Sequence, residues 1–297
     1  MLRVLHFSDV HLQASLEGVP LRELVSKRFI GLMNLRLLRG RRFRQTREKL
    51  SGLARLAVEA RVDLVISTGD HTALGTRPEL AEARRLLEPF TKTRLGLITM
   101  PGNHDVYLPD AIRDGRFEHH FGDLLVTDLP DLSVDGPWPL VRLVTEDVVV
   151  VAVNSARPNP QPWLSSGRIP DRQLKALRET LSDARLAGRF VVVATHYAPR
   201  LWNGRPDHVR HGLENADDFL EVCARLERGM VVHGHVHRCF HVRVPGLGAP
   251  IFGAGSATDL GREGLWLFEL GAGGGTATPG TWADGRYVLE RNKEIVI

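Results

Sequence analysis

The chain has 297 residues, of which 43% are hydrophobic and 25% charged, with a formal net charge of +4, as expected of a globular protein with a substantial core. No stretch approaches the roughly 18–20 consecutive apolar residues of a membrane-spanning helix, residues 1–10 lack the zones of a signal peptide, and two cysteines do not form a disulfide framework. We therefore expect a cytoplasmic protein, with any membrane contact peripheral and at the inner membrane surface.

Short apolar runs, each followed at once by Asp, His, Asn or Gly, predict buried strands over residues 4–7, 64–67, 97–100, 190–194 and 230–232. Helical spacing predicts helices over 46–60, 78–90, 171–186 and 215–227. This alternation of strand and helix predicts an α/β sheet. Residues 141–153 predict a hairpin, and 106–139 and 156–170 are typical of loops. The Gly/Thr composition of 271–280 predicts a flexible linker, with 286–297 as an edge strand or a tail.

Potential metal ligands follow each predicted strand of the sheet. In chain order they are Asp9-Val10-His11, Gly69-Asp70, Gly102-Asn103-His104-Asp105, His196 and Gly234-His235-Val236-His237. In open α/β sheets functional groups gather beyond the carboxyl ends of the strands, so these side chains should converge. Carboxylates and imidazoles together suit Mn, Fe, Zn or Co, and a shared carboxylate can hold two such ions about 3.5–4 Å apart. The sequence therefore predicts a site for two divalent metal ions.

This ordered series resembles the five-block signature of the calcineurin-like metallophosphoesterases, and its spacing is similar to that of their bacterial cyclic-nucleotide-phosphodiesterase-like branch. The resemblance implies a four-layer αββα sandwich with two mixed β-sheets, in the α/β class (α+β by some schemes). It places the metallophosphoesterase domain at residues 1–270, followed by the Gly-rich linker and tail at 271–297.

Carried over position by position, the resemblance implies one metal ion held by Asp9, His11, Asp70 and His237, and a second held by Asp70, Asn103, His196 and His235. His104 would bind the phosphoryl oxygen or protonate the leaving alkoxide, and Asp105 would orient the His104 imidazole. The implied reaction is hydrolysis of a phosphate ester, with a phosphodiester favoured, by in-line attack of a metal-bridging hydroxide. A DNA or RNA nuclease on the same site and a non-catalytic scaffold of the same fold are alternatives.

Other residues predict substrate contacts less directly. His71 stands where the family usually has an apolar residue, and it either lines the pocket, supports a ligand or points away as a loop side chain. The loop after His196 contains Trp202, Arg205, His208, Arg210 and His211, which suit recognition of a phosphate or a base, or form an ordinary surface loop. We take His71, Arg210 and His211 as candidate substrate-binding residues.

Residues 21–50 carry ten Lys/Arg and two acidic residues, a net charge of +8, which leaves the rest of the chain at −4. This imbalance argues against a uniformly basic nucleic-acid-binding body. The charges alternate with large apolar residues such as Phe29 and Leu37, which something should cover. The favoured interpretation is a basic, apolar insertion at about 20–45 that packs on its own protein near the first ligands. Two alternatives are that this segment contacts anionic lipid or that it binds a polynucleotide. The candidate substrates are cyclic nucleotides, glycerophosphodiesters and nucleotide-linked lipid precursors.

Overall fold

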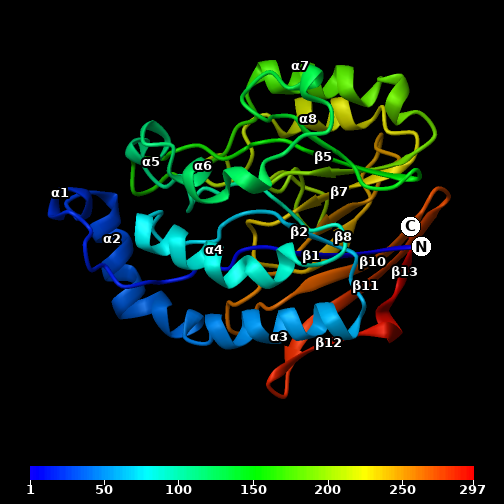
Figure 1. Cartoon of the computed structure of the whole chain (residues 1–297). Coiled ribbons are helices and arrows are strands. Elements are labelled where there is room, and N and C mark those ends of the chain that lie inside the picture. Colours follow the sequence, from blue (N-terminus) through cyan, green and yellow to red (C-terminus); the bar gives the residue numbers. More distant parts are fainter.

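Apolar strands with alternating side chains build two mixed β-sheets in the described part of the chain (Figure 1). The computed structural model describes residues 1–297, with all side chains except those of Arg22, Leu38 and Arg39. The first sheet has the strand order β12-β11-β10-β1-β2-β3, with β13 paired to β11. The second has the order β4-β5-β6-β7-β9-β8. Each sheet pairs some strands in parallel and others antiparallel, as between β1 and β2 and between β1 and β10.

The strands of the first sheet are β1 (Leu2–Phe7), β2 (Leu64–Ser67), β3 (Leu97–Thr99), β10 (Leu265–Gly271), β11 (Gly274–Ala283), β12 (Arg286–Leu289) and β13 (Ile295–Val296). Those of the second are β4 (Leu140–Leu143), β5 (Val148–Ala152), β6 (Phe190–Ala194), β7 (Gly229–His233), β8 (Phe240–Val242) and β9 (Ile251–Gly253). The longer helices outside them are α3 (Thr46–Glu59), α4 (Arg77–Thr91), α7 (Asp171–Leu181) and α8 (Ala216–Cys223). The predicted strands and the 141–153 hairpin are confirmed.

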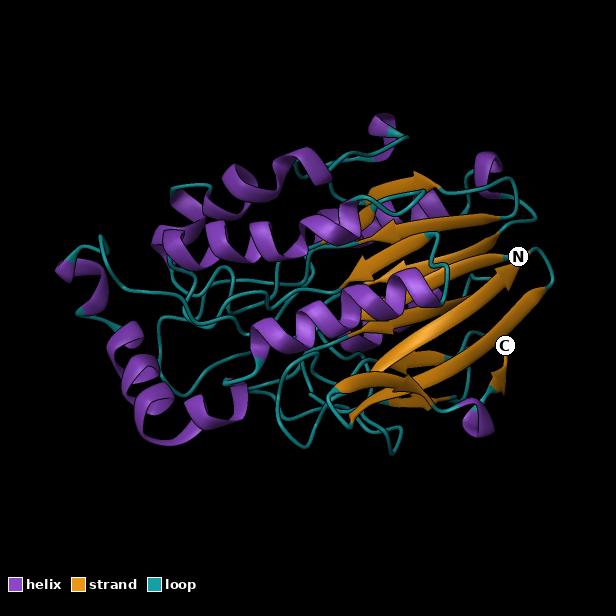
Figure 2. Cartoon of the chain, turned by 60° about the horizontal axis from the view of Figure 1, so that its bottom comes forward, coloured by secondary structure: helices purple, strands orange, loops and turns teal.

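Strand β5 shows how the layers arise. Val148 and Val150 face an inter-sheet core shared with the first sheet, whereas Val149 and Val151 face a second core that includes Leu177 of α7 and other side chains of α7 and α8. A third core packs β1 and β2 against α3 and α4. Because successive side chains of a strand point to opposite faces, one valine-rich strand serves two cores. The four-layer sandwich is thereby confirmed, and Figure 2 shows loops gathered at the end of the strands opposite the chain termini.

Residues 21–43, here called the insertion, leave the sandwich after β1. They form α1 (Leu21–Leu24), α2 (Lys27–Asn34), a π-helix (Leu35–Arg39) and a 3-10 helix (Gly40–Phe43). Arg28 is buried, and its guanidinium donates to Asp110 at 2.7 and 3.0 Å and to the Leu74 carbonyl at 3.0 Å. Removing one member of such a buried pair leaves an unpaired charge, which costs about 3–5 kcal/mol. The insertion is therefore fixed to its own protein.

The expectation of a loop over 106–139 is wrong in part. Residues Pro109–Arg113 form α5, and Arg116–Phe121 form α6. Phe117 and Phe121 are one helical turn apart and both buried, their rings stacked at 4.7 Å. Arg116, also buried, binds Asp110 and Glu23 and so ties α6 to the insertion. Such short helices are difficult to predict from the sequence, because their few buried residues stand among many polar ones.

The described helices are all too short or too polar to cross a bilayer.

The expectation of a Gly-rich linker at 271–280 is also wrong, because β11 runs through it between β10 and β12. Ala277 and Thr278 are buried, and the last residues complete the sheet as β12 and β13. A Cβ on Gly275 would lie 1.9 Å from the carbonyl oxygen of Glu269. The glycine here permits close approach of two strands, and its composition does not signal flexibility.

A matched pair of glycine substitutions distinguishes a strand from a linker. We expect Gly275→Ala to lower the free energy of unfolding by about 1–3 kcal/mol, because the added methyl meets the Glu269 backbone. Gly273→Ala should change it by less than about 0.5 kcal/mol, since no heavy atom lies within 4 Å of that Cβ. Urea unfolding followed by circular dichroism measures both. Equal values for the two variants would contradict the pairing of β11 with β10.

Candidate metal centre

The predicted ligands come from both sheets and meet at the seam between them. Backbone hydrogen bonds link the loops that follow the strands. The Asp9 N–H donates to the Gly69 carbonyl at 3.0 Å, and the Gly234 N–H donates to the His196 carbonyl at 3.0 Å. The loops after β1 and β2 are thus tied together, as are those after β6 and β7. All seven predicted ligands lie at this edge, where they form two clusters of potential ligand atoms.

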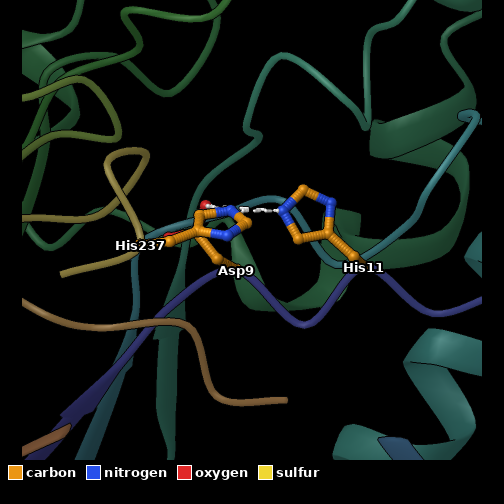
Figure 3. A group of neighbouring side chains, drawn as sticks. All are labelled: Asp9, His11 and His237. Atoms are coloured by element: carbon orange, nitrogen blue, oxygen red, sulfur yellow. Dashed lines mark hydrogen bonds and ion pairs between the residues drawn. The ribbon is translucent and has the colours of Figure 1, made fainter. Parts of the chain in front are cut away.

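The first cluster consists of Asp9, His11 and His237, whose side chains point toward one another (Figure 3). The Nε2 atoms of His11 and His237 are 2.8 Å apart. Asp9 Oδ1 lies 3.2 Å from Nε2 of His237 and 3.6 Å from Nε2 of His11. This oxygen is buried and has no hydrogen-bond donor among the described residues. A buried carboxylate oxygen in this position is available to a cation.

The second cluster consists of Asn103, His196 and His235. Oδ1 of Asn103 lies 3.2 Å from Nε2 of His196 and 3.0 Å from Nδ1 of His235. Asp70 stands between the two clusters, with Oδ2 3.6 Å from Nε2 of His11 and Oδ1 3.6 Å from Nε2 of His196. A single carboxylate therefore reaches both clusters, as a bridging ligand must.

Hydrogen bonds behind the histidines fix which ring nitrogen carries the proton. His196 donates from Nδ1 to the Thr68 carbonyl at 2.7 Å, and His235 donates from Nε2 to the His211 carbonyl at 3.0 Å. His237 donates from Nδ1 to Asp259 at 2.9 Å. In each neutral ring the other nitrogen then faces the cluster with a lone pair. The side-chain carbonyl oxygen of Asn103 therefore lies 3.2 and 3.0 Å from ring nitrogens of His196 and His235 that carry lone pairs, an arrangement that repels itself and that a divalent cation would stabilise.

The electrostatics of the centre keep Asp9 ionised and the His196 and His235 rings neutral. Burial alone would raise the pKa of Asp9, but His237 and His11 beside it hold that pKa well below its usual range. Burial would lower the pKa of His237, but Asp9 and Asp259 beside it raise that pKa. Burial lowers the pKa of His196, and burial together with His211 and His196 lowers that of His235 well below its usual range. Ionised carboxylates and neutral imidazoles are the forms that bind metal ions.

Backbone strain is concentrated at the same place. Five of the predicted ligands adopt left-handed φ values, namely Asp9 (57°), His11 (46°), Asp70 (56°), His235 (71°) and His237 (49°). Such conformations cost about 1–2 kcal/mol each for residues other than glycine. Gly234 is required here, because a Cβ on it would lie 1.9 Å from Ser8 Oγ and 2.6 Å from Asp9 Oδ2. Strain held by the surrounding structure at one site indicates function.

His104 lies beside the clusters, as expected. Its Nδ1 donates to the Ala73 carbonyl at 2.6 Å, and its ring meets that of His11 edge-on at 4.7 Å. A ring nitrogen lies within 4.8 Å of ligand atoms of His11 and Asp70. The expectation that Asp105 orients this imidazole is wrong, because the Ala73 carbonyl does so. Asp105 instead accepts hydrogen bonds from Nδ1 of His71 at 3.0 Å and from the backbone of Gly102 at 2.9 Å.

The role expected of His71 as a substrate contact is also wrong. The side chain is fully buried, and it neither lines the cavity nor points away from the protein. Its Nδ1 donates to Asp105, and its Nε2 lies 3.2 Å from Ser67 Oγ and 3.0 Å from Thr99 Oγ1. Through Asp105 and Gly102, His71 supports the loop that carries Asn103.

An open cavity of about 560 Å³ lies over the metal-ligand clusters. Its wall includes Lys27 and Arg42 of the insertion, together with Trp163 and Trp202. His211 lines it as well, with its ring tilted by 35° to that of His235 at a centroid distance of 4.2 Å, and its Nδ1 donates to Asp207 at 2.6 Å. Arg210 is exposed and lies outside the described lining, and the substrate roles of Arg210 and His211 stay predictions.

Several residues of the site were not predicted from the sequence. The side chain of Asp259 is fully buried and accepts hydrogen bonds from both His237 and Arg42, yet this residue lies in a loop that matches no motif. The sequence identified Lys27 and Arg42 only as members of a basic segment, and no pattern in it predicted that Trp163 lines the cavity. Their proximity to the clusters follows from the fold of the insertion and of the loop at 156–170.

We expect Asp259→Asn to weaken Mn²⁺ binding at the first cluster about 10–100-fold, because the charge that orients His237 is lost. Asp131→Asn is the matched control, since it removes a carboxylate bound to Arg185, outside the cavity lining. Calorimetric titration with Mn²⁺ measures both variants. Unchanged affinity in Asp259→Asn would exclude His237 as a metal ligand in the proposed tautomer.

Comparison with known proteins agrees with this geometry. A family model described as calcineurin-like phosphoesterase matches residues 2–239. A dimetal phosphatase from Danio rerio has a similar structure, with a TM-score of 0.64 and 14% identity over 97% of this chain and 98% of its own. A purple acid phosphatase from yellow lupin (Lupinus luteus) seeds has a TM-score of 0.62 and 12% identity, over 97% of this chain and 52% of its own. No curated protein sequence matches the chain significantly. The structures establish the fold, and the family model establishes that the chain belongs to the calcineurin-like phosphoesterases.

Proposed function

We propose that the protein hydrolyses a phosphodiester with two divalent metal ions held by the first cluster, the second cluster and Asp70 between them. The observation that carries the proposal is the position of Asp70, whose two carboxylate oxygens each lie 3.6 Å from a histidine of a different cluster. Family membership supports phosphoester hydrolysis as the reaction. Carboxylate, amide and imidazole ligands suit Mn, Fe, Zn or Co.

When bound, the metal ions would polarise the phosphoryl oxygens and lower the pKa of water to make a nucleophile available at neutral pH. The chain itself places the ligands, keeps Asp9 ionised and His196 and His235 neutral, and shields them from solvent. Asp9, Asp70, His196 and His235 are all buried. These side chains then need to move little when negative charge develops on the substrate during the reaction.

His104 is suited to assist the leaving group. Because its Nδ1 is committed to the Ala73 carbonyl, its Nε2 is the nitrogen that can exchange a proton or a hydrogen bond with a substrate. In the protonated ring, that N–H can bind a phosphoryl oxygen or pass its proton to the departing alkoxide. The interaction with Ala73 replaces the carboxylate that the sequence analysis expected behind this ring.

Lys27 gives the cavity a cation that can bind the substrate phosphate. Its Nζ donates to the carbonyl of Asn159 at 2.7 Å and to that of Leu164 at 2.8 Å. An ammonium group has three N–H donors, so these two carbonyls leave one for a phosphate oxygen, beside the Tyr107 ring whose centroid lies 5.0 Å from Nζ. The cavity of about 560 Å³ has room for substituents on both sides of a phosphate, which supports a diester over a monoester. A phosphomonoester, as in the phosphatases of similar fold, is the competing substrate.

We expect His104→Ala to lower kcat for a chromogenic phosphodiester about 10²–10⁴-fold with bound Mn²⁺ unchanged, because His104 acts on the substrate rather than on the metal ions. Asn103→Ala, which removes a ligand, should lower both activity and metal content. Bis(p-nitrophenyl) phosphate and p-nitrophenyl phosphate are compared under the same conditions. Preference for the monoester would overturn the diester assignment. If Asn103→Ala left turnover unchanged, the result would favour a non-catalytic scaffold.

A pH profile tests the role of Lys27. Burial lowers the pKa of Lys27 to about 8, so its charge is present below that pH and is lost as the pH rises through it. We expect the KM of the wild-type protein to rise about tenfold relative to that of Lys27→Arg above pH 8, because arginine stays charged. Parallel KM profiles for the two proteins would show that Lys27 does not bind the substrate anion.

A further inference from the structure

The insertion presents an apolar stripe to solvent. Its side chains recur at every fourth residue and are largely exposed, namely Leu21 (79%), Val25 (81%), Phe29 (55%), Met33 (36%) and Leu37 (70%), with Ile30 (52%) beside them. Phe29 and Met33 lie one turn apart on the same face of α2, whereas Leu21 belongs to α1, Val25 lies between the two helices and Leu37 lies in the π-helix. Figure 1 shows α1 and α2 at the left edge of the molecule, on the side away from the chain termini. So many exposed apolar side chains in one short segment are unusual for a surface that remains in water.

The opposite face of the insertion is held by the protein. Arg28 is bound to Asp110 and Leu74, and Leu32 and Leu35 pack against a small core that includes Leu74 and Tyr107. Because these contacts fix the insertion, its exposed stripe cannot be buried by rotation of the helix. The stripe therefore needs an external partner.

The apolar surface continues around the mouth of the catalytic cavity. Ile30 belongs to the exposed stripe and also lines the cavity. Trp163 (65% exposed) and Trp202 (45% exposed) line the same cavity. Tryptophan favours the interface between water and lipid, where its ring is buried and its N–H stays hydrated. A flat partner that covered the stripe would thus lie across the cavity opening.

Charge favours an anionic partner. Arg36 and Arg41 of the insertion and Arg44 just after it are exposed, whereas Glu23, the acidic residue of the insertion, is engaged by Arg116 at 2.9 Å. Apolar side chains flanked by unpaired arginines are the signature of helices that lie on anionic membranes. A soluble protein partner would require matched pockets, whereas a bilayer accepts such a stripe without them.

We propose that the insertion, together with Trp163 and Trp202, docks the protein on an anionic lipid bilayer and directs the metal centre toward the head groups. The membrane contact stands independently of the proposed function. The inference that the substrate is a phosphate ester carried by a lipid rests on that function and deepens it. Lys27 and Arg42, on the insertion side of the cavity, would then meet phosphates presented by the membrane.

The test is flotation of the full chain with vesicles of phosphatidylcholine mixed with phosphatidylglycerol, compared with vesicles of phosphatidylcholine alone. We expect strong binding to the mixed vesicles and weak binding to the neutral ones. Val25→Glu should lower partition about tenfold or more, because it places a charge in the apolar contact. Val58→Glu is the matched control, since Val58 is 78% exposed but lies on α3, outside the stripe. Phe29→Glu provides a second variant of the stripe.

Activity on bis(p-nitrophenyl) phosphate without vesicles checks folding and should be the same for Val25→Glu and Val58→Glu. Equal flotation of these two variants would overturn the proposal. Loss of a dimer in Val25→Glu, seen by analytical ultracentrifugation without vesicle binding by the wild type, would show instead that the stripe is an interface between copies of the chain. Vesicle binding without phosphodiester turnover would leave the membrane contact standing and reject the proposed function separately.

Discussion

Mutual repulsion among lone pairs is the constraint on which the centre depends. The carbonyls of Thr68 and His211 each accept a hydrogen bond from one nitrogen of His196 or His235, so the other ring nitrogens face the acceptor oxygen of Asn103 at 3.2 and 3.0 Å. Nothing in a protein interior favours this arrangement unless positive charge lies within it. Two cations on either side of Asp70 would convert the repulsion into coordination. The left-handed backbone of five ligands fits the same requirement, since strain is tolerated where binding energy offsets it.

The sandwich explains how so many ligands can be brought together. β1, β2 and β3 carry ligands from the first sheet, and β6 and β7 carry them from the second, so the seam between the sheets becomes the site. The inter-sheet core fixes the distance between the two sets of strand ends. The insertion adds the wall that holds Lys27 and Arg42, and the contact of Arg42 with Asp259 links this wall to a residue that orients His237. The insertion therefore connects the candidate metal ligands, Lys27 and the exposed stripe.

Apolar strands that end in polar residues were sufficient to predict an α/β sheet and the convergence of the seven ligands, whereas the four layers were implied by the resemblance to the calcineurin-like metallophosphoesterases. The role that the resemblance implied for Asp105 was wrong. His104 and Asp105 are neighbours, but their side chains diverge, and Asp105 serves His71. The prediction at β11 was also wrong, because glycines needed for close strand packing resembled a linker. Asp259 could not have been found, since its role depends on a loop position that no periodicity records.

The most direct test of the account is the anomalous scattering of crystals grown with Mn²⁺. The account predicts two peaks about 3.5–4 Å apart on either side of Asp70, one next to Asp9, His11 and His237 and the other next to Asn103, His196 and His235. A single peak, or peaks that Asp70 does not join, would contradict it.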